Sequence, residues 1–127
     1  MQTRQIPKSE WPLFLDRFSY QHEGWLVKLE ILNPELGAQV EETGLALQGL
    51  TGEWDEAKGN TIMIMAGNEP DGHVTHSISN PTEVSLERTD DGADVALSIK
   101  SADGTTALLS FRAAVLPETV DALVGQL

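Results

Sequence analysis

The sequence predicts an α+β fold dominated by antiparallel sheet, barrel-like or sandwich-like, with six to eight short strands, an N-terminal amphipathic helix and a short C-terminal helix. Three observations support this prediction: alternating apolar residues in the second half of the chain, a helical apolar stripe near the N-terminus, and turn signals roughly every ten residues. At 127 residues the chain is long enough to bury a core. We therefore expect residues 1–127 to form a single domain.

The alternation is clearest in residues 82–112, TEVSLERTDDGADVALSIKSADGTTALLSFR. Three runs of period two are separated by Asp91-Gly92 and Asp103-Gly104, residue pairs that tolerate the positive φ of tight turns. A period of two places each apolar set on one face of a sheet. This stretch therefore predicts a three-stranded antiparallel meander with one buried face and one solvated face.

Residues 9–24 have the pattern of an amphipathic helix. Ser9 is the expected N-cap and Gly24 the expected stop, and residues 1–8 form a lead-in. The apolar residues fall at positions i, i+3, i+4 and i+7, which form one stripe on a helix: Trp11, Phe14, Leu15 and Phe18. A weaker stripe after Pro117 predicts the C-terminal helix: Val120, Leu123, Val124 and Leu127.

Between the first helix and the meander the pattern predicts further strands. They fall at residues 25–31, 45–54 and 73–79, and residues 38–43 form a candidate edge strand. The apolar parity switches at Gly49, which indicates a bulge. Residues 61–66, TIMIMA, are apolar at nearly every position and predict a central strand covered on both faces.

Charge and composition restrict the class of partner. The chain has 8 Lys and Arg against 20 Asp and Glu, a net charge of −12, and the excess lies entirely after residue 32. Because nucleic-acid binding depends on cations that neutralise phosphates, we expect no nucleic-acid partner and no anionic membrane. The chain has no cysteine, no apolar run of roughly 20 residues and no apolar signal region at its start, so we expect a cytoplasmic location.

His73 and His76 form the sequence HVTH. On a helix they could share a metal, but residues three apart on a strand point to opposite faces. The structural interpretation is that His76 is a half-buried, hydrogen-bonded residue beside Val74 and Ile78.

His22, Glu23 and Trp25 cluster at the junction between the helix and the first strand. A histidine beside a carboxylate could act as a base or orient a ligand. The structural alternative is that a cationic His22 is stabilised by the helix C-terminus while Trp25 anchors the strand on the helix.

The other polar clusters lack the spacing of known sites. Asp90, Asp91 and Asp94 surround Gly92, but they do not follow the pattern of a calcium loop, and a polar hairpin turn explains them. No nucleophile motif and no phosphate loop occurs. We therefore expect no metal, no cofactor and no identifiable catalytic residue.

Three stretches carry a resemblance to a known family: IPKSEWPLFLDRFSYQHEGWLV (residues 6–27), DGHVTHSISNPTEVSLE (residues 71–87) and LSIKSADGTTALLSFR (residues 97–112). The chain resembles a bacterial family of short single-domain proteins known only as a domain of unknown function. The resemblance implies a cytosolic bacterial protein and no activity. Polar and aromatic residues of these stretches are the candidate ligand-binding residues: His22, Glu23, Trp25, His73 and His76.

Two function classes fit these observations. The first is a non-catalytic binding or assembly module, whose partner is another protein or a second copy in a homo-oligomer, because the strand at residues 61–66 is apolar on both faces. The alternative is a small-ligand-binding protein or an unrecognised enzyme that uses His22, Glu23 and His76 under the helix. A metal-binding protein is a third hypothesis, and the sequence leaves open whether the protein is an enzyme.

Overall fold

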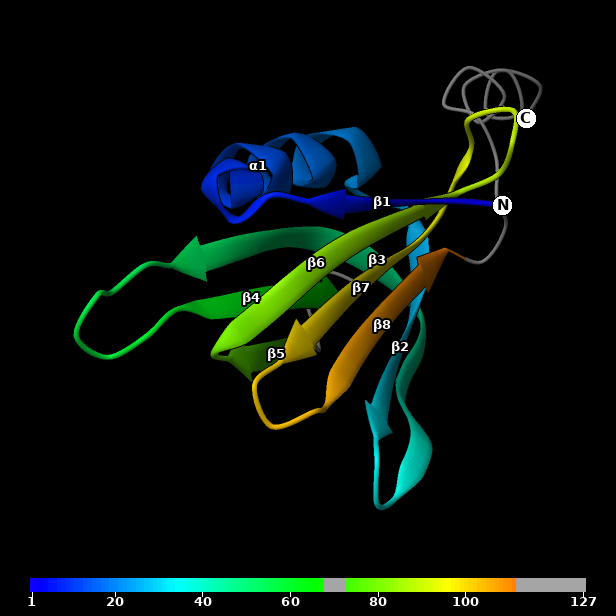
Figure 1. Ribbon diagram of the computed structural model, residues 1–127. Helices are drawn as coiled ribbons and strands as arrows, with labels where there is room; N and C mark the ends of the chain where they lie inside the picture. The colour runs from blue at the N-terminus through cyan, green and yellow to red at the C-terminus, as the bar shows by residue number, and fades with distance from the viewer. Residues whose placement is uncertain (68–72, 112–127) are drawn as a thin grey trace.

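The computed structural model describes residues 1–67 and 73–111 (Figure 1). The described elements, in chain order, are β1 (Gln2–Ile6), the 3-10 turn η1 (Lys8–Glu10), α1 (Trp11–His22), β2 (Leu26–Asn33), β3 (Gly37–Glu53), β4 (Thr61–Gly67), β5 (His73–Ser79), β6 (Pro81–Arg88), β7 (Asp94–Ser101) and β8 (Thr106–Phe111). The prediction of an α+β fold with an N-terminal helix is confirmed. The expected helix after Pro117 lies outside the described residues.

The eight strands within the described ranges form one antiparallel sheet in the order β1-β6-β7-β8-β2-β3-β4-β5. The sheet is open, with β1 and β5 at its two edges, and it curls so that β4 and β5 lie behind β6 and β7 in the view of Figure 1. The curl depends on β3, whose first half pairs with β2 and whose second half pairs with β4. A register shift next to Gly49 confirms the predicted bulge.

The predicted meander is confirmed as β6, β7 and β8. Gly92 and Gly104 have φ of 92° and 88° in the two turns, a conformation that glycine adopts without steric cost. Alternate residues of these strands form the centre of the core, where Leu97, Ile99 and Leu109 are fully buried. Residues 2–6 were expected to be a lead-in, but they form an additional strand because β6 offers them an unpaired edge.

The helix α1 covers the concave side of the curled sheet, as its apolar stripe predicts. Trp11, Leu15 and Phe18 are buried, and the indole Nε1 of Trp11 donates a hydrogen bond of 2.9 Å to the carbonyl of Ile6. The expected N-cap at Ser9 is wrong, because η1 already turns the chain and the helix begins at Trp11 without a side-chain cap. In the described ranges no helix is long and apolar enough to span a bilayer.

Strand β4 departs from its prediction. Ile62 and Ile64 are buried in the core, but Met63 and Met65 on the opposite face are only half-buried. Within the described residues the expectation that both faces of this strand are covered is met only on the core side, where Ile62 and Ile64 belong to the core cluster. The outer face of β4 leaves apolar surface accessible to solvent.

Candidate functional site

His22 is the last residue of α1 and is only 1% exposed, an unusual environment for a titratable side chain. Its ring stacks on Phe111 with centroids 4.7 Å apart, and it lies 4.2 Å from the ring of Phe18. Trp25 presents its edge to the imidazole at 4.6 Å. Three aromatic rings therefore surround His22 and exclude water from it.

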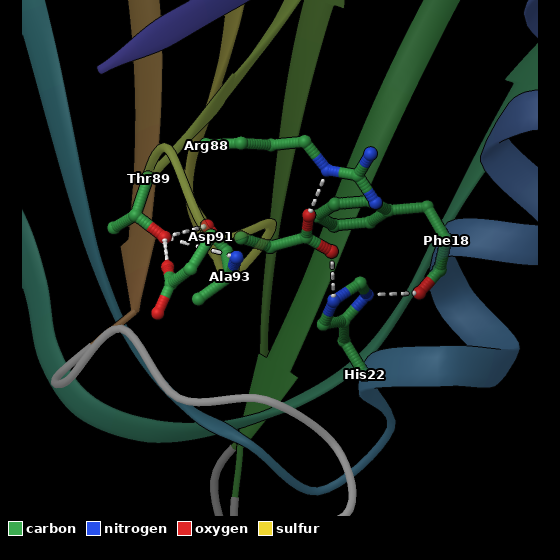
Figure 2. Close-up of polar contacts among 7 residues, drawn as sticks. Phe18, His22, Arg88, Thr89, Asp91 and Ala93 are labelled. Carbon is green, nitrogen blue, oxygen red and sulfur yellow. Dashed lines mark hydrogen bonds and ion pairs between the residues drawn. The ribbon is translucent and has the colours of Figure 1, made fainter.

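Both ring nitrogens of His22 face oxygen atoms that can accept hydrogen bonds (Figure 2). Nδ1 lies 2.8 Å from the carbonyl oxygen of Phe18, and Nε2 lies 2.7 Å from Oδ2 of Asp94. A carbonyl and an ionised carboxylate only accept, and only the imidazolium form of the ring can donate to both of them. In that form His22 is a buried cation paired with the carboxylate of Asp94.

Asp94 joins this cation to Arg88. The two residues are register partners at the start of β7 and the end of β6, and Nε of Arg88 donates to Oδ1 of Asp94 at 2.8 Å. Burial raises the pKa of the Asp94 carboxyl, but hydrogen bonds from His22 and Arg88 and their positive charges outweigh burial and hold the pKa below its ordinary value. The result is a chain of charged hydrogen bonds that runs from the buried His22 to the partly exposed Arg88.

The other two aspartates of the neighbouring turn between β6 and β7 form hydrogen bonds within the protein. The hydroxyl of Thr89 donates to the carboxylate of Asp91 and accepts a hydrogen bond of 3.0 Å from the amide of Ala93 (Figure 2). Asp90 accepts a hydrogen bond from the N-terminal ammonium group at 2.9 Å. Each aspartate around Gly92 therefore has a partner within the protein, which agrees with a polar turn.

Arg88 borders a groove between α1 and strands β1, β6 and β7, which we call the arginine groove. It encloses about 190 Å³. Its lining includes three cationic side chains, four apolar side chains and two carboxylates: Arg4, Arg17, Arg88, Leu13, Phe14, Phe18, Leu86, Glu10 and Asp94. The whole chain contains four arginines, so most of them gather in this one place on a protein of net charge −12.

Comparison with known proteins gives the family. The model of a family of unknown function, DUF5335, matches residues 2–119. The chain belongs to this family. An uncharacterized protein of Aquifex aeolicus (strain VF5) is 30% identical over 119 residues, which cover 93% of this chain and 100% of that relative. No solved structure matches the chain.

In this DUF5335 chain the candidate residues of the first junction separate into two groups. His22 and Trp25 pack together in the aromatic cluster, whereas Glu23 is exposed at the C-cap of α1. Gly24 has φ of 88° and ends the helix as predicted. The junction therefore orients His22 towards Asp94, with no described contact between its ring and Glu23.

The two histidines of β5 lie elsewhere. His73 is exposed, and His76 is half-buried on the same face as Val74 and Ile78, as the structural interpretation predicts, but its ring makes no hydrogen bond within the described residues. His76 lines a separate cavity of about 260 Å³ between β5, β2 and the β7–β8 turn. The described residues thus give His22 and His76 no common cavity, and within these residues no group of His, Asp and Glu is arranged to hold a metal.

The sequence of this chain contains Asp94, Arg88, Arg17 and Arg4, but no local pattern marks them as one site. Asp94 falls in a turn in which acidic residues are common, and the arginines lie on three different elements. The scarcity of arginine in an acidic chain is the one signal that could have drawn attention to them.

Proposed function

We propose that this protein is a non-catalytic binding module that holds the anionic group of an organic ligand in the arginine groove. The observation that supports this most is the position of Arg88, whose Nε is held by Asp94 at 2.8 Å while Asp94 is held by the buried His22. A guanidinium fixed in this way leaves its two terminal nitrogens free to donate to a carboxylate or a phosphate. The buried ion pair positions the binding cation.

The other two arginines strengthen the same site. Arg4 forms only a long contact of 3.6 Å with Glu10, and both side chains are more than half exposed. Arg17 forms no ion pair with any residue in the described ranges. An arriving anion can therefore compete for these guanidinium groups, and charge-assisted hydrogen bonds of this kind contribute about 1.5–3 kcal/mol each.

The groove also favours a particular chemistry for the part of the ligand that carries no charge. Phe14, Phe18 and Leu86 give it an apolar wall beside the arginines. A small inorganic anion would leave that wall exposed to water, so an anion with an aromatic or aliphatic body fits better. The shared chemistry is one carboxylate or phosphate group on an apolar body.

The environment of His22 supports binding over catalysis. A general base needs an unprotonated nitrogen within reach of substrate, but both nitrogens of His22 are occupied and the ring is 1% exposed. The acidic surface also makes nucleic acid and anionic membrane unsuitable partners. We place the protein in the cytoplasm, because the chain has no cysteine.

The test is an amide NMR titration of the isotope-labelled protein with benzoate and phenyl phosphate, and with acetate and inorganic phosphate as the corresponding small anions. We expect the aromatic anions to shift resonances of groove residues such as Leu86 at lower concentration than the small anions do. A preference for benzoate or for phenyl phosphate distinguishes a carboxylate ligand from a phosphate ligand.

Arg17→Gln should weaken binding of the preferred aromatic anion roughly tenfold. The matched control is Lys100→Gln, which removes one positive charge from an exposed position of β7 outside the groove. Two results would overturn the proposal: no groove resonance responds to either aromatic anion, or Lys100→Gln weakens binding as much as Arg17→Gln does.

A further inference from the structure

In the part of the chain that the structure describes, strand β5 is an unprotected edge of the sheet. It pairs with β4 along its whole length, from His73 opposite Gly67 to Ser79 opposite Thr61. Within the described ranges no other strand pairs with it, and residues 73–79 make no backbone hydrogen bond outside the sheet. The outer edge of β5 therefore presents backbone donors and acceptors that another strand can pair with.

The opposite edge of the sheet is protected and provides a comparison. Strand β1 has five residues, carries Arg4 at its centre and is tied to the β6–β7 turn by the bond between the N-terminal ammonium and Asp90. Strand β5 has seven residues, HVTHSIS, with no Lys, Arg, Asp, Glu or Pro. Charges and prolines on edge strands are the usual protection against pairing with another chain, and β5 has neither.

The charge distribution indicates which partner this edge fits. The protein has 20 acidic residues, but β4 and β5, TIMIMAG and HVTHSIS, contain none. Two copies of a chain with net charge −12 repel each other across most of their surface. The two strands themselves therefore add no acidic charge at the edge where a second copy would pair.

We propose that β5 of a second copy pairs antiparallel with β5 across a two-fold axis at His76. In a two-fold interface, if one residue contacts a second, the second contacts the first in the other copy. The sequence of β5 meets this condition. Centring the axis on His76 places Thr75 opposite Ser77, Val74 opposite Ile78 and His73 opposite Ser79.

These pairs match in chemistry as well as in position. On the solvent-facing side of β5, the hydroxyl group of Thr75 lies opposite that of Ser77 in the second copy. Both residues are exposed in the single chain. The inner face aligns two β-branched apolar residues, Val74 and Ile78, a favourable cross-strand pair. A seven-residue strand pair is small beside a stable interface of roughly 1,200–2,000 Å², so the dimer depends on concentration.

The first test is sedimentation of the full chain from micromolar to millimolar concentration. The double variant Thr75→Glu with Ser77→Glu puts like charges opposite each other twice across the axis and should weaken dimerisation roughly tenfold or more. The control, Thr3→Glu with Gln5→Glu, adds the same charge to exposed positions of the other edge, β1, and should leave dimerisation unchanged. A wild-type protein that stays monomeric, or equal effects of both variants, would overturn the proposal.

The second test reads the register directly, because the chain has no cysteine. With the axis at residue 76, His76→Cys places two thiols opposite each other, within the range in which a disulfide forms. The control Ser79→Cys is more exposed, but that register separates its two thiols by about 20 Å. Oxidation should cross-link only the first variant, and equal cross-linking of both would refute this register.

Discussion

His22 and Asp94 lie 72 positions apart in the chain, yet Nε2 of the imidazole and Oδ2 of the carboxylate are 2.7 Å apart. This bond joins the end of α1 to the first residue of β7. Removing a charged group from water is costly unless its partners replace the lost hydrogen bonds. Here the imidazolium has two hydrogen-bond acceptors, and Asp94 also accepts a hydrogen bond from Arg88. The pair is therefore fully hydrogen-bonded.

Asp94→Asn should destabilise the protein strongly. The variant leaves the imidazolium of His22 in an aromatic pocket without a counter-ion, and breaking a buried ion pair in this way costs about 3 kcal/mol or more. Urea denaturation followed by tryptophan fluorescence measures the loss. Asp16→Asn is the matched control, because Asp16 is exposed on α1, and its effect should stay below about 0.5 kcal/mol.

The same pair makes stability depend on pH at the acid end. The folded-state pKa of Asp94 lies below the ordinary value of 3.8, so the unfolded chain binds a proton at this residue more readily. Its stabilising contribution is complete above the unfolded-state pKa and is lost as pH falls through the folded-state pKa. The difference in unfolding free energy between wild type and Asp94→Asn should therefore shrink from about pH 5 downwards.

Comparing the unfolding free energies of wild type and Asp94→Asn at each pH removes the pH dependence that other carboxylates contribute. Asp103 is one of them: hydrogen bonds from Ser101 and from Thr105 lower its pKa, so it contributes with the same sign. It titrates alike in wild type and in Asp94→Asn and cancels. A difference that stays constant from pH 6 to pH 3 would contradict the ion pair.

Ser19→Ala should loosen the contact between α1 and the bulge of β3. The Ser19 hydroxyl accepts a hydrogen bond of 2.7 Å from the amide of Leu50, and the carbonyls of Leu15 and Leu50 lie within 3.0 Å to receive its proton. Without the Ser19 hydroxyl the Leu50 amide loses its hydrogen-bond acceptor, which should lower the free energy of unfolding by about 1–3 kcal/mol. Hydrogen exchange should show faster exchange at Leu50, and Ser98→Ala, whose side chain has no hydrogen bond among the described residues, should leave it unchanged.

Phe111→Leu tests the aromatic cluster around His22. The Phe111 ring lies 5.0 Å from Trp25 and 5.8 Å from Phe18, in addition to its stacking on the imidazole. Leucine retains most of the apolar burial but loses these ring contacts, which should cost about 1–2 kcal/mol. Phe14→Leu is the comparison, because Phe14 is half-buried and pairs only with Phe18 among the described rings. An equal loss in both variants would refute the role of the cluster.

Arg88→Gln should separate binding from stability. The Arg88 side chain is 44% exposed, so its ion pair with Asp94 contributes less than about 1 kcal/mol to folding. Binding of the aromatic anion should nevertheless fall roughly tenfold, as for Arg17→Gln. Arg88→Lys should restore little of it, because an ammonium group cannot bind Asp94 and a ligand with one planar fork. Unfolding and titration of the same samples decide between these outcomes.

Periodicity and turn chemistry were sufficient to predict the local elements. The alternation in residues 82–112 and the turns at Gly92 and Gly104 correspond to β6, β7 and β8. The apolar stripe of residues 11–18 corresponds to the buried face of α1. These predictions succeed because side-chain direction repeats every two residues in a strand and every 3.6 in a helix. Local sequence therefore determined which faces are buried.

Where the local pattern was interrupted, the prediction was less accurate. Gly44 divides the apolar pattern of residues 38–54, so the sequence indicated two strands, but β3 runs unbroken through Gly44 as Gly37–Glu53. Its two halves pair with different neighbours, β2 and β4, and the bulge at Gly49 lets one strand serve both. Such continuity depends on the partner strands and not on the residues of β3 alone.

The sequence by itself determined the fold class, the face of α1 that is buried, and the excess of acidic charge. Only the tertiary structure decided that Asp94 is the partner of His22, that three arginines share one groove, and that β5 forms an edge of the sheet. The physical reason is that periodicity depends on neighbouring residues, whereas each of these relationships depends on strand order. Strand order is set by contacts between residues far apart in the chain, and no repeat in the sequence records them.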